Sequence, residues 1–226
     1  MSSGSCSAIV PVKPLVEALG RLSEILDGPR RRALQAAMLA DVLDACMHAE
    51  LVDETFVVTN DAAAATVAGT CGARVLNDYV PPRGVNPAVE VGLSHAVSDG
   101  VETALVLTAD LPQVTPAALD GLIGAARDWP VTLVPSSSGT GTNAMVLRPP
   151  DVIGPHLGLG SLALHQEAAA TVGVECHVAP VPALAVDVDH PDDLLAVVES
   201  GESGIEFARA WRVVGMDRFL GTTASS

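Results

Sequence analysis

Two acidic motifs carry the residue types and spacing of a metal site. Asp110 follows the apolar run 103–108, and Asp187 and Asp189 are separated by one residue. In an extended chain, residues i and i+2 point to the same side, so these two carboxylates would face one point. Because like charges repel, such a pair favours a cation between them, and hard oxygen ligands suit Mg²⁺.

Each motif also has a purely structural interpretation. Asp110 could cap a turn before Pro112, and Asp189 could cap the helix that follows it. Pro191 favours the first position of that helix, which makes His190 the cap residue and weakens the structural interpretation of Asp189. Asp192 and Asp193 are then first-turn acids that favour the positive end of the helix.

Three further segments could bind anions. The glycine–threonine segment 139–143 (GTGTN) offers close backbone approach and neutral donors, although a hairpin turn has the same composition. Segment 158–161 (GLGS) precedes an expected helix and could bind phosphate, or Ser161 could be an ordinary helix cap. Lys13 and Arg21 follow the first expected strand and could hold a polyphosphate, or could simply be solvated.

Apolar runs of strand length alternate with segments of helical spacing, which predicts an α/β fold with a mainly parallel, mixed sheet flanked by helices. Strands are expected at 8–12, 55–59, 73–76, 103–108, 131–134, 144–147, 174–178 and 184–188, and helices at 29–48, 62–71, 87–98, 115–128, 161–172 and 191–200. A loop is expected at 79–84. Ligands of such sheets bind at the carboxyl ends of the strands, where the acidic motifs lie.

We expect a flexible N-terminus at 1–7, one domain at 8–200 and a C-terminal extension at 201–226. The extension contains Trp211 and Phe219 without a clear period, so it is either packed on the domain or partly disordered.

The chain has 226 residues and a formal net charge of −15. This charge argues against a nucleic acid or an anionic membrane as partner. No secretory signal is recognised at the N-terminus and no apolar run has the length of a membrane span. The four cysteines form no CxxC motif, and we expect free thiols in a reducing cytoplasm.

Taken together, the segments IVPVKPL, LTADLPQVTP, GTGTNAMVLRPP, LGLGSLALH and AVDVDHPDDL resemble, in this order, the 2-phospho-L-lactate and phosphoenolpyruvate guanylyltransferases (CofC and FbiD) of coenzyme F-420 biosynthesis. The resemblance covers about residues 8–200. It implies a nucleotide-diphospho-sugar transferase (GT-A-like) fold. It also implies transfer of GMP from GTP to the phosphate of a small phosphorylated acid, with release of pyrophosphate.

The resemblance also implies the roles of individual residues. Asp110, Asp187 and Asp189 would hold Mg²⁺ and be catalytic. The acceptor would bind at Thr142, Gly158 and Ser161, and the nucleotide at Lys13, Arg21 and Asn86. A homodimer and a hand-off of the product to a downstream transferase are further expectations.

Two positions depart from the family pattern. Leu19 stands where the family usually has lysine, and Ser136-Ser137 where it usually has an aspartate–arginine pair. The lost charges leave two alternatives open. One is a related nucleotidyltransferase with another nucleotide or acceptor, such as CTP or 3-phosphoglycerate, and the other is a catalytically weak nucleotide-binding regulatory paralogue.

Overall fold

The computed structural model describes residues 5–77 and 84–214, so most of the expected loop at 79–84 and Phe219 lie outside the described residues. The described strands are β1 (Cys6–Pro11), β2 (Glu54–Val58), β3 (Arg74–Leu76), β4 (Thr103–Leu107), β5 (Val131–Pro135), β6 (Thr142–Leu147) and β7 (Cys176–Val178). They form one sheet in the order β3-β2-β1-β4-β6-β5-β7. Strand β6 runs antiparallel to β4 and β5, and the other pairs are parallel, so the predicted mixed sheet is confirmed.

The described α-helices are α1 (Gly28–His48), α2 (Ala62–Cys71), α3 (Val85–Ser98), α4 (Pro116–Ala125), α5 (Ser161–Val172), α6 (Pro191–Ser200) and α7 (Ile205–Val214). Short 3-10 turns lie at η1 (Leu15–Glu17), η2 (Gly20–Leu22), η3 (Ala126–Asp128) and η4 (Pro182–Leu184). No helix within the described ranges is long and apolar enough to cross a membrane.

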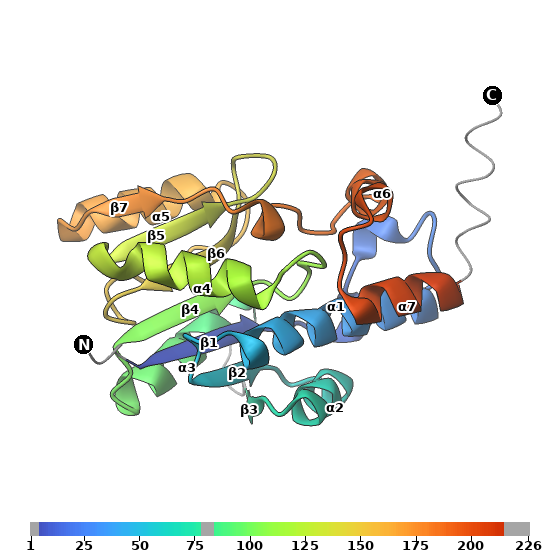
Figure 1. Cartoon of the computed structure of the whole chain (residues 1–226), viewed down its shortest axis with the longest axis horizontal. Helices are drawn as coiled ribbons and strands as arrows, with labels where there is room; N and C mark the ends of the chain where they lie inside the picture. Colours follow the sequence, from blue (N-terminus) through green and yellow to red (C-terminus); the bar gives the residue numbers. More distant parts are fainter. Residues whose placement is uncertain (1–4, 78–83, 215–226) are drawn as a thin grey trace.

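The sheet is covered by helices on both faces (Figure 1). Because side chains alternate along a strand, Ala8 and Val10 of β1 point to the face covered by α1, α2 and α4, and Ile9 points to α3. A side chain at Gly92 of α3 would overlap that of Ile9, so glycine here allows the helix to approach β1 closely.

Several helices begin after a residue whose side chain or backbone satisfies the first helical turn. The side chain of Asp61 accepts hydrogen bonds from the first turn of α2, and that of Thr115 accepts from Ala118 N in α4. His190 is the cap residue of α6, as predicted, and its backbone N–H donates to the Asp193 carboxylate at 2.7 Å. The four cysteines are free thiols, also as predicted.

The expected strand at 184–188 is wrong. This segment begins with the turn η4 and then continues without joining a sheet ladder. Its backbone bonds are isolated: Val188 N donates to Asp110 O at 3.1 Å and Ser137 N to Ala185 O at 2.7 Å. The segment therefore crosses the carboxyl end of β4, and this crossing carries Asp187 and Asp189 to Asp110.

A third apolar cluster lies beyond the carboxyl ends of the strands, where α7 runs alongside α1 (Figure 1). Phe207 and Trp211 of α7 pack there with residues of α1, of α6, of the loop between β1 and α1, which includes Leu19, and with Val188 of the crossing segment. Asp41 of α1 accepts hydrogen bonds from Glu206 N and Phe207 N. The start of the C-terminal extension is thus helical and packed.

Candidate active site

A cavity of about 650 Å³ opens at the carboxyl ends of β1 and β4, where the sequence places the candidate residues. Its wall is completed by the antiparallel start of β6, the segment 157–161 and the crossing segment with Asp187 and Asp189. Of the nine residues proposed from the sequence, eight line this cavity: Lys13, Arg21, Asp110, Thr142, Gly158, Ser161, Asp187 and Asp189. The ninth, Asn86, does not.

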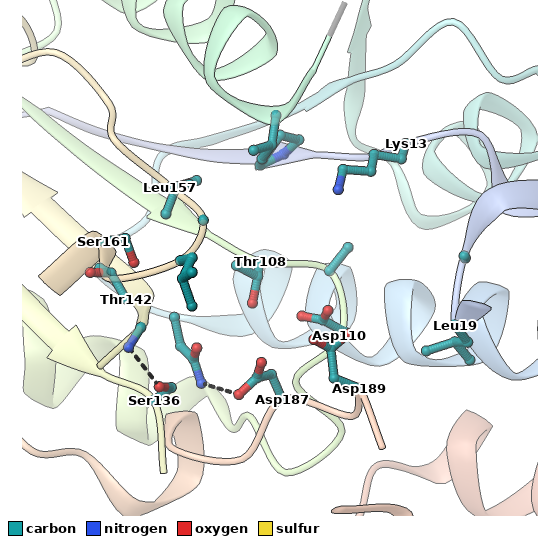
Figure 2. A pocket seen from close by; sticks show the side chains of 18 of the residues that line it. Lys13, Leu19, Thr108, Asp110, Ser136, Thr142, Leu157, Ser161, Asp187 and Asp189 are labelled. Atoms are coloured by element: carbon teal, nitrogen blue, oxygen red, sulfur yellow. Dashed lines mark hydrogen bonds between the residues drawn. The ribbon is translucent and has the colours of Figure 1, made fainter. Parts of the chain in front are cut away.

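The three aspartates come from two segments that meet in the cavity (Figure 2). Asp110 lies just after the end of β4. The carbonyl of the preceding residue, Ala109, accepts a hydrogen bond from Gln35 Nε2 of α1 at 2.9 Å. Asp187 accepts a hydrogen bond from Asn143 Nδ2 at 3.2 Å, and the same amide also bonds to the carbonyls of Leu184 and Ala185. Asn143 therefore fixes the crossing segment to β6.

Asp110 is poorly compensated in the protein. Its Oδ1 atom is buried and has no hydrogen-bond partner among the described residues. Burial is the largest cause that raises the pKa of Asp110 to about 6, and the charges of Asp187 and Asp189 add to it. Burial likewise raises the pKa of Asp187, which the Asn143 hydrogen bond opposes. A charged group in this position calls for a cation.

Carboxylates outnumber basic side chains on the cavity wall. Among the described lining residues, two cations, Lys13 and Arg21, face four carboxylates, those of Glu17, Asp110, Asp187 and Asp189. Within residues 5–77 and 84–214, no three acidic, histidine or cysteine side chains are gathered closely enough to form a metal centre by themselves. Asp110, Asp187 and Asp189 would therefore need further ligands from a bound substrate to complete the coordination of a divalent cation.

The opposite part of the wall is neutral and rich in donors. Thr142 begins β6, and Ser161 begins α5, where the helix N-terminus favours an anion. Gly158 has φ +129° and Gly160 has φ +70°, conformations that favour glycine, and these two residues bend the chain into α5. The predicted anion site thus has a helix start, two hydroxyls and two glycines with positive φ on one wall.

The family model for CofC-like guanylyl transferases matches residues 6–216. The chain belongs to this family. A relative from Conexibacter woesei, named phosphoenolpyruvate guanylyltransferase, is 42% identical over 86% of this chain and 88% of its own length. The catalytic class predicted from the sequence, nucleotidyltransferase, agrees with this membership.

Solved structures support the fold of this CofC-like chain. A protein from Desulfovibrio desulfuricans G20, described as a nucleotide-diphospho-sugar transferase, gives a TM-score of 0.78 at 16% identity and covers 98% of both chains. Glucosyl-3-phosphoglycerate synthase from Mycobacterium tuberculosis, solved with Mn²⁺ and uridine diphosphate, gives a TM-score of 0.58 at 15% identity, over 87% of this chain and 76% of that one.

Lys13 and Arg21, the two basic residues predicted to bind the nucleotide, both line the cavity of this CofC-like chain. Lys13 is exposed, and its side chain points toward Thr108 and Asp110 in Figure 2. Arg21 pairs with Asp189 at 2.6 Å, with side-chain exposures of 61% and 48%. Exposed pairs of this kind contribute about 0–1 kcal/mol. An incoming triphosphate and cation could therefore separate the two side chains at little cost.

Asn86 has a different environment from the one that the resemblance implies. Its Nδ2 donates to Leu157 O at 3.1 Å, and its Oδ1 accepts from Leu157 N at 2.7 Å. Both ends of the amide are thus used on the backbone next to Gly158. This geometry favours positioning of the anion-binding segment over direct contact with the nucleotide.

Replacing Asn86 with alanine separates these two roles. We expect the KM for the phosphorylated acid to rise about tenfold, because a loss of about 1–2 kcal/mol in buried hydrogen bonding loosens segment 157–161. The KM for GTP should stay within about twofold. Steady-state kinetics with each substrate varied in turn measure both; a larger effect on GTP would restore the nucleotide assignment.

His165 is a functional candidate that the sequence reasoning passed over. It is fully buried in α5, and its ring nitrogens lie within hydrogen-bond distance of Thr142, which lines the cavity, and of the backbone of His156. Burial is the main cause that lowers the pKa of His165 to about 4, with a smaller contribution from the charge of His156. The only indication in the sequence is its place in the segment LGLGSLALH, where His165 follows Ser161 by four residues.

This low pKa predicts that acid destabilises the protein through His165. Between pH 6.5, the ordinary pKa, and about 4, the unfolded chain binds a proton that the folded protein does not. The free energy of unfolding therefore rises with pH in this window, by up to about 3 kcal/mol, and the contribution is complete above pH 6.5. Urea unfolding at pH 7 and pH 5 measures it.

The matched control is His165→Asn, which cannot titrate. Asp110 acts in the same window with the opposite sign, since its raised pKa makes the folded state bind more protons, but it does so in both proteins. The wild type should lose more stability than the variant on acidification. Equal losses would mean that His165 is not buried in neutral form.

Proposed function

We propose that this protein transfers GMP from GTP to the phosphate of a small phosphorylated acid, with phosphoenolpyruvate as the preferred acceptor over 2-phospho-L-lactate, and releases pyrophosphate. The observation that carries the proposal is the meeting of three aspartates and the Thr142–Ser161 wall in one cavity of a CofC-like chain. The name of the Conexibacter relative supports phosphoenolpyruvate as acceptor.

In this proposal the triphosphate and the acceptor bind to different residues of the cavity wall. Lys13 and Arg21 bind the triphosphate, and Thr142, Gly158 and Ser161 bind the phosphate and carboxylate of the acceptor. Asp110, Asp187 and Asp189 would hold Mg²⁺, which when bound offsets negative charge on the triphosphate and on the departing pyrophosphate. The Mn²⁺ in the Mycobacterium tuberculosis neighbour supports a divalent ion in this type of fold.

The reaction needs positioning more than acid–base chemistry. An oxygen of the acceptor phosphate attacks the α-phosphorus of GTP, a new P–O–P bond forms, and the bond to pyrophosphate breaks. The attacking phosphate is already largely ionised near pH 7, so no side chain must remove a proton. The task of this chain's residues is to align the two phosphates and balance their charge.

The two departures from the family pattern bear on this charge balance. Leu19 is buried in the third apolar cluster while it lines the cavity, so no cation reaches the triphosphate from this position. Ser136 Oγ accepts from Gly141 N at 3.0 Å and bonds to Ser138 Oγ at 2.9 Å, so hydroxyls hold the GTGT turn. We therefore expect stronger dependence on Mg²⁺ than in relatives that keep the lysine.

The test is a pyrophosphate-release assay with GTP, Mg²⁺ and phosphoenolpyruvate, followed by panels of nucleotides and phosphorylated acids. Turnover should be fastest with GTP and phosphoenolpyruvate, and the product should contain GMP joined to the acceptor phosphate by mass spectrometry. Faster turnover with CTP or 3-phosphoglycerate would overturn the substrate assignment. Binding of Mg²⁺ and GTP without turnover on any acceptor would indicate a regulatory paralogue.

The remaining expectations belong to this proposal as well. A cytoplasmic location, a homodimer and hand-off of the product to a downstream transferase are consistent with a small-molecule enzyme whose product serves a biosynthetic pathway. Light scattering of the purified chain tests the dimer.

A further inference from the structure

His165 sits behind the cavity wall with hydrogen bonds on both sides of its ring. Its Nε2 lies 2.8 Å from the backbone nitrogen of His156, and its Nδ1 lies 3.1 Å from Thr142 Oγ1. The ring has no exposed surface and does not line the cavity, whereas Thr142 does. The imidazole therefore reaches the cavity through the Thr142 hydroxyl and, one helical turn earlier, through the backbone of Ser161.

The backbone partner fixes the tautomer of this ring. A backbone N–H can only donate, so Nε2 must accept from His156, and the single proton of the neutral ring is on Nδ1. Nδ1–H then donates to Thr142 Oγ1. No other hydrogen bond to this hydroxyl occurs within residues 5–77 and 84–214, so its own hydrogen is free to point into the cavity.

We propose that His165 is a positioning residue that holds the Thr142 hydroxyl as a hydrogen-bond donor toward the acceptor substrate. The cavity then selects, at this point, an oxygen that can only accept, such as that of a phosphate or carboxylate, over a substrate hydroxyl that needs to donate. The inference rests on the proposed function in one respect, namely that Thr142 contacts the phosphorylated acid.

The same ring joins the two parts of the anion-binding wall. Through Nδ1 it holds β6 at Thr142, and through Nε2 it holds residue 156, which leads into the segment that Asn86 fixes at Leu157. One contact orients a hydroxyl and the other places backbone. The two roles use different nitrogens, so two variants can separate them.

The first experiment asks about the hydrogen bonds and needs no substrate. Nitrogen-15 NMR of the full chain should show His165 neutral, with its proton on Nδ1, between pH 5 and pH 8. A proton on Nε2, or a ring that titrates near pH 6.5, would overturn the inference whatever the enzyme's substrate is. This result also stands if a His165 variant fails to fold.

The second experiment compares two conservative variants. His165→Asn can place an N–H near the position of Nδ1 and keep the donor to Thr142, whereas His165→Gln can place an acceptor near Nε2 and keep the bond from His156 N. We expect the KM for phosphoenolpyruvate to rise about tenfold in the Gln variant and less in the Asn variant. The KM for GTP should stay within about twofold in both.

The third step is a double-mutant cycle with Thr142→Val, which removes the hydroxyl but keeps the shape of the side chain. If His165 acts through Thr142, His165→Gln should add less than about a twofold change to the KM for phosphoenolpyruvate in the Thr142→Val background. Independent, multiplying effects would overturn the inference. If the wild type accepts no phosphorylated acid while the NMR result holds, the proposed function fails and the orientation of Thr142 stands.

Discussion

Asp110→Asn is expected to lower kcat about 1000-fold or more while it makes the metal-free protein more stable. The catalytic loss follows because the site would keep two of three carboxylates, and a cation there supplies several kcal/mol of transition-state stabilisation. The stability gain follows because Asp110 Oδ1 is buried without a partner beside Asp187 and Asp189. An amide removes this charge and its repulsion.

The size and the pH dependence of the stability gain can be stated. The pKa of Asp110, raised from 3.8 to about 6, sets an upper limit of about 3 kcal/mol, and we expect about 1–2 kcal/mol because the residue is only half-buried. Since the wild type loses stability as pH rises through this range, the gain is complete above about pH 6 and shrinks toward pH 4.

Urea unfolding in EDTA measures the gain, and thermal unfolding with and without Mg²⁺ measures the binding of the ion. The wild type should be stabilised by Mg²⁺ in the presence of GTP, and the variant much less. Asp151→Asn, at an exposed position outside the cavity lining, is the matched control and should change neither quantity. Wild-type turnover in Asp110→Asn would remove this residue from the proposed metal site.

The centre of the sheet could be predicted because its inner strands are buried on both faces. The run 103–108 is apolar at its four inner positions, and residues 103–107 form β4 in the centre of the sheet. The helix caps can be predicted in the same way, because the side chains of Asp61 and Thr115 bond to the first turn of the helix that follows each of them. These signals are local, so the sequence alone carries them.

The same rule failed at 184–188, for a physical reason. Leu184 packs in the apolar core between the sheet and α1, α2 and α4, and Val188 packs in the third apolar cluster. The segment is therefore apolar because it crosses between two cores. Alternation of apolar and acidic residues there resembles a strand. An alternating pattern does not specify the partners of the backbone hydrogen bonds. These partners depend on the tertiary structure.

The grouping of most candidate residues around one cavity could be predicted from the sequence, and their hydrogen-bond partners could not. The types of Asp110, Asp187 and Thr142 indicate metal and anion chemistry, and the carboxyl-end rule indicates where they lie. That both ends of the Asn86 amide bond to Leu157, or that His165 bonds to a threonine 23 residues away, depends on side-chain geometry across the fold. Here residue type allowed several roles, and only the contacts favour one.

The helix α7 gives the last large effect. Phe207→Ala should lower the free energy of unfolding by about 3–5 kcal/mol, the usual cost of truncating a buried aromatic side chain. Phe207 is 1% exposed, and its ring is stacked with that of Trp211, with 6.4 Å between the ring centroids. Its backbone N–H also donates a hydrogen bond to the Asp41 carboxylate. If residues 201–214 were instead a loosely attached tail, the change would be close to zero.

The variant should also weaken the site, because the third apolar cluster contains Leu19 beside Arg21, and Val188 between the two aspartates. A cavity at Phe207 loosens both segments, so the KM for GTP should rise severalfold under conditions where the protein is still folded. Val213→Ala, on the same helix but 82% exposed, is the matched control and should stay within about 0.5 kcal/mol of the wild type. Urea unfolding with an unchanged m-value, together with GTP kinetics, distinguishes the two outcomes. A stability loss under about 1 kcal/mol in Phe207→Ala would show that α7 does not support the segment with Asp187 and Asp189, where we propose that the metal binds.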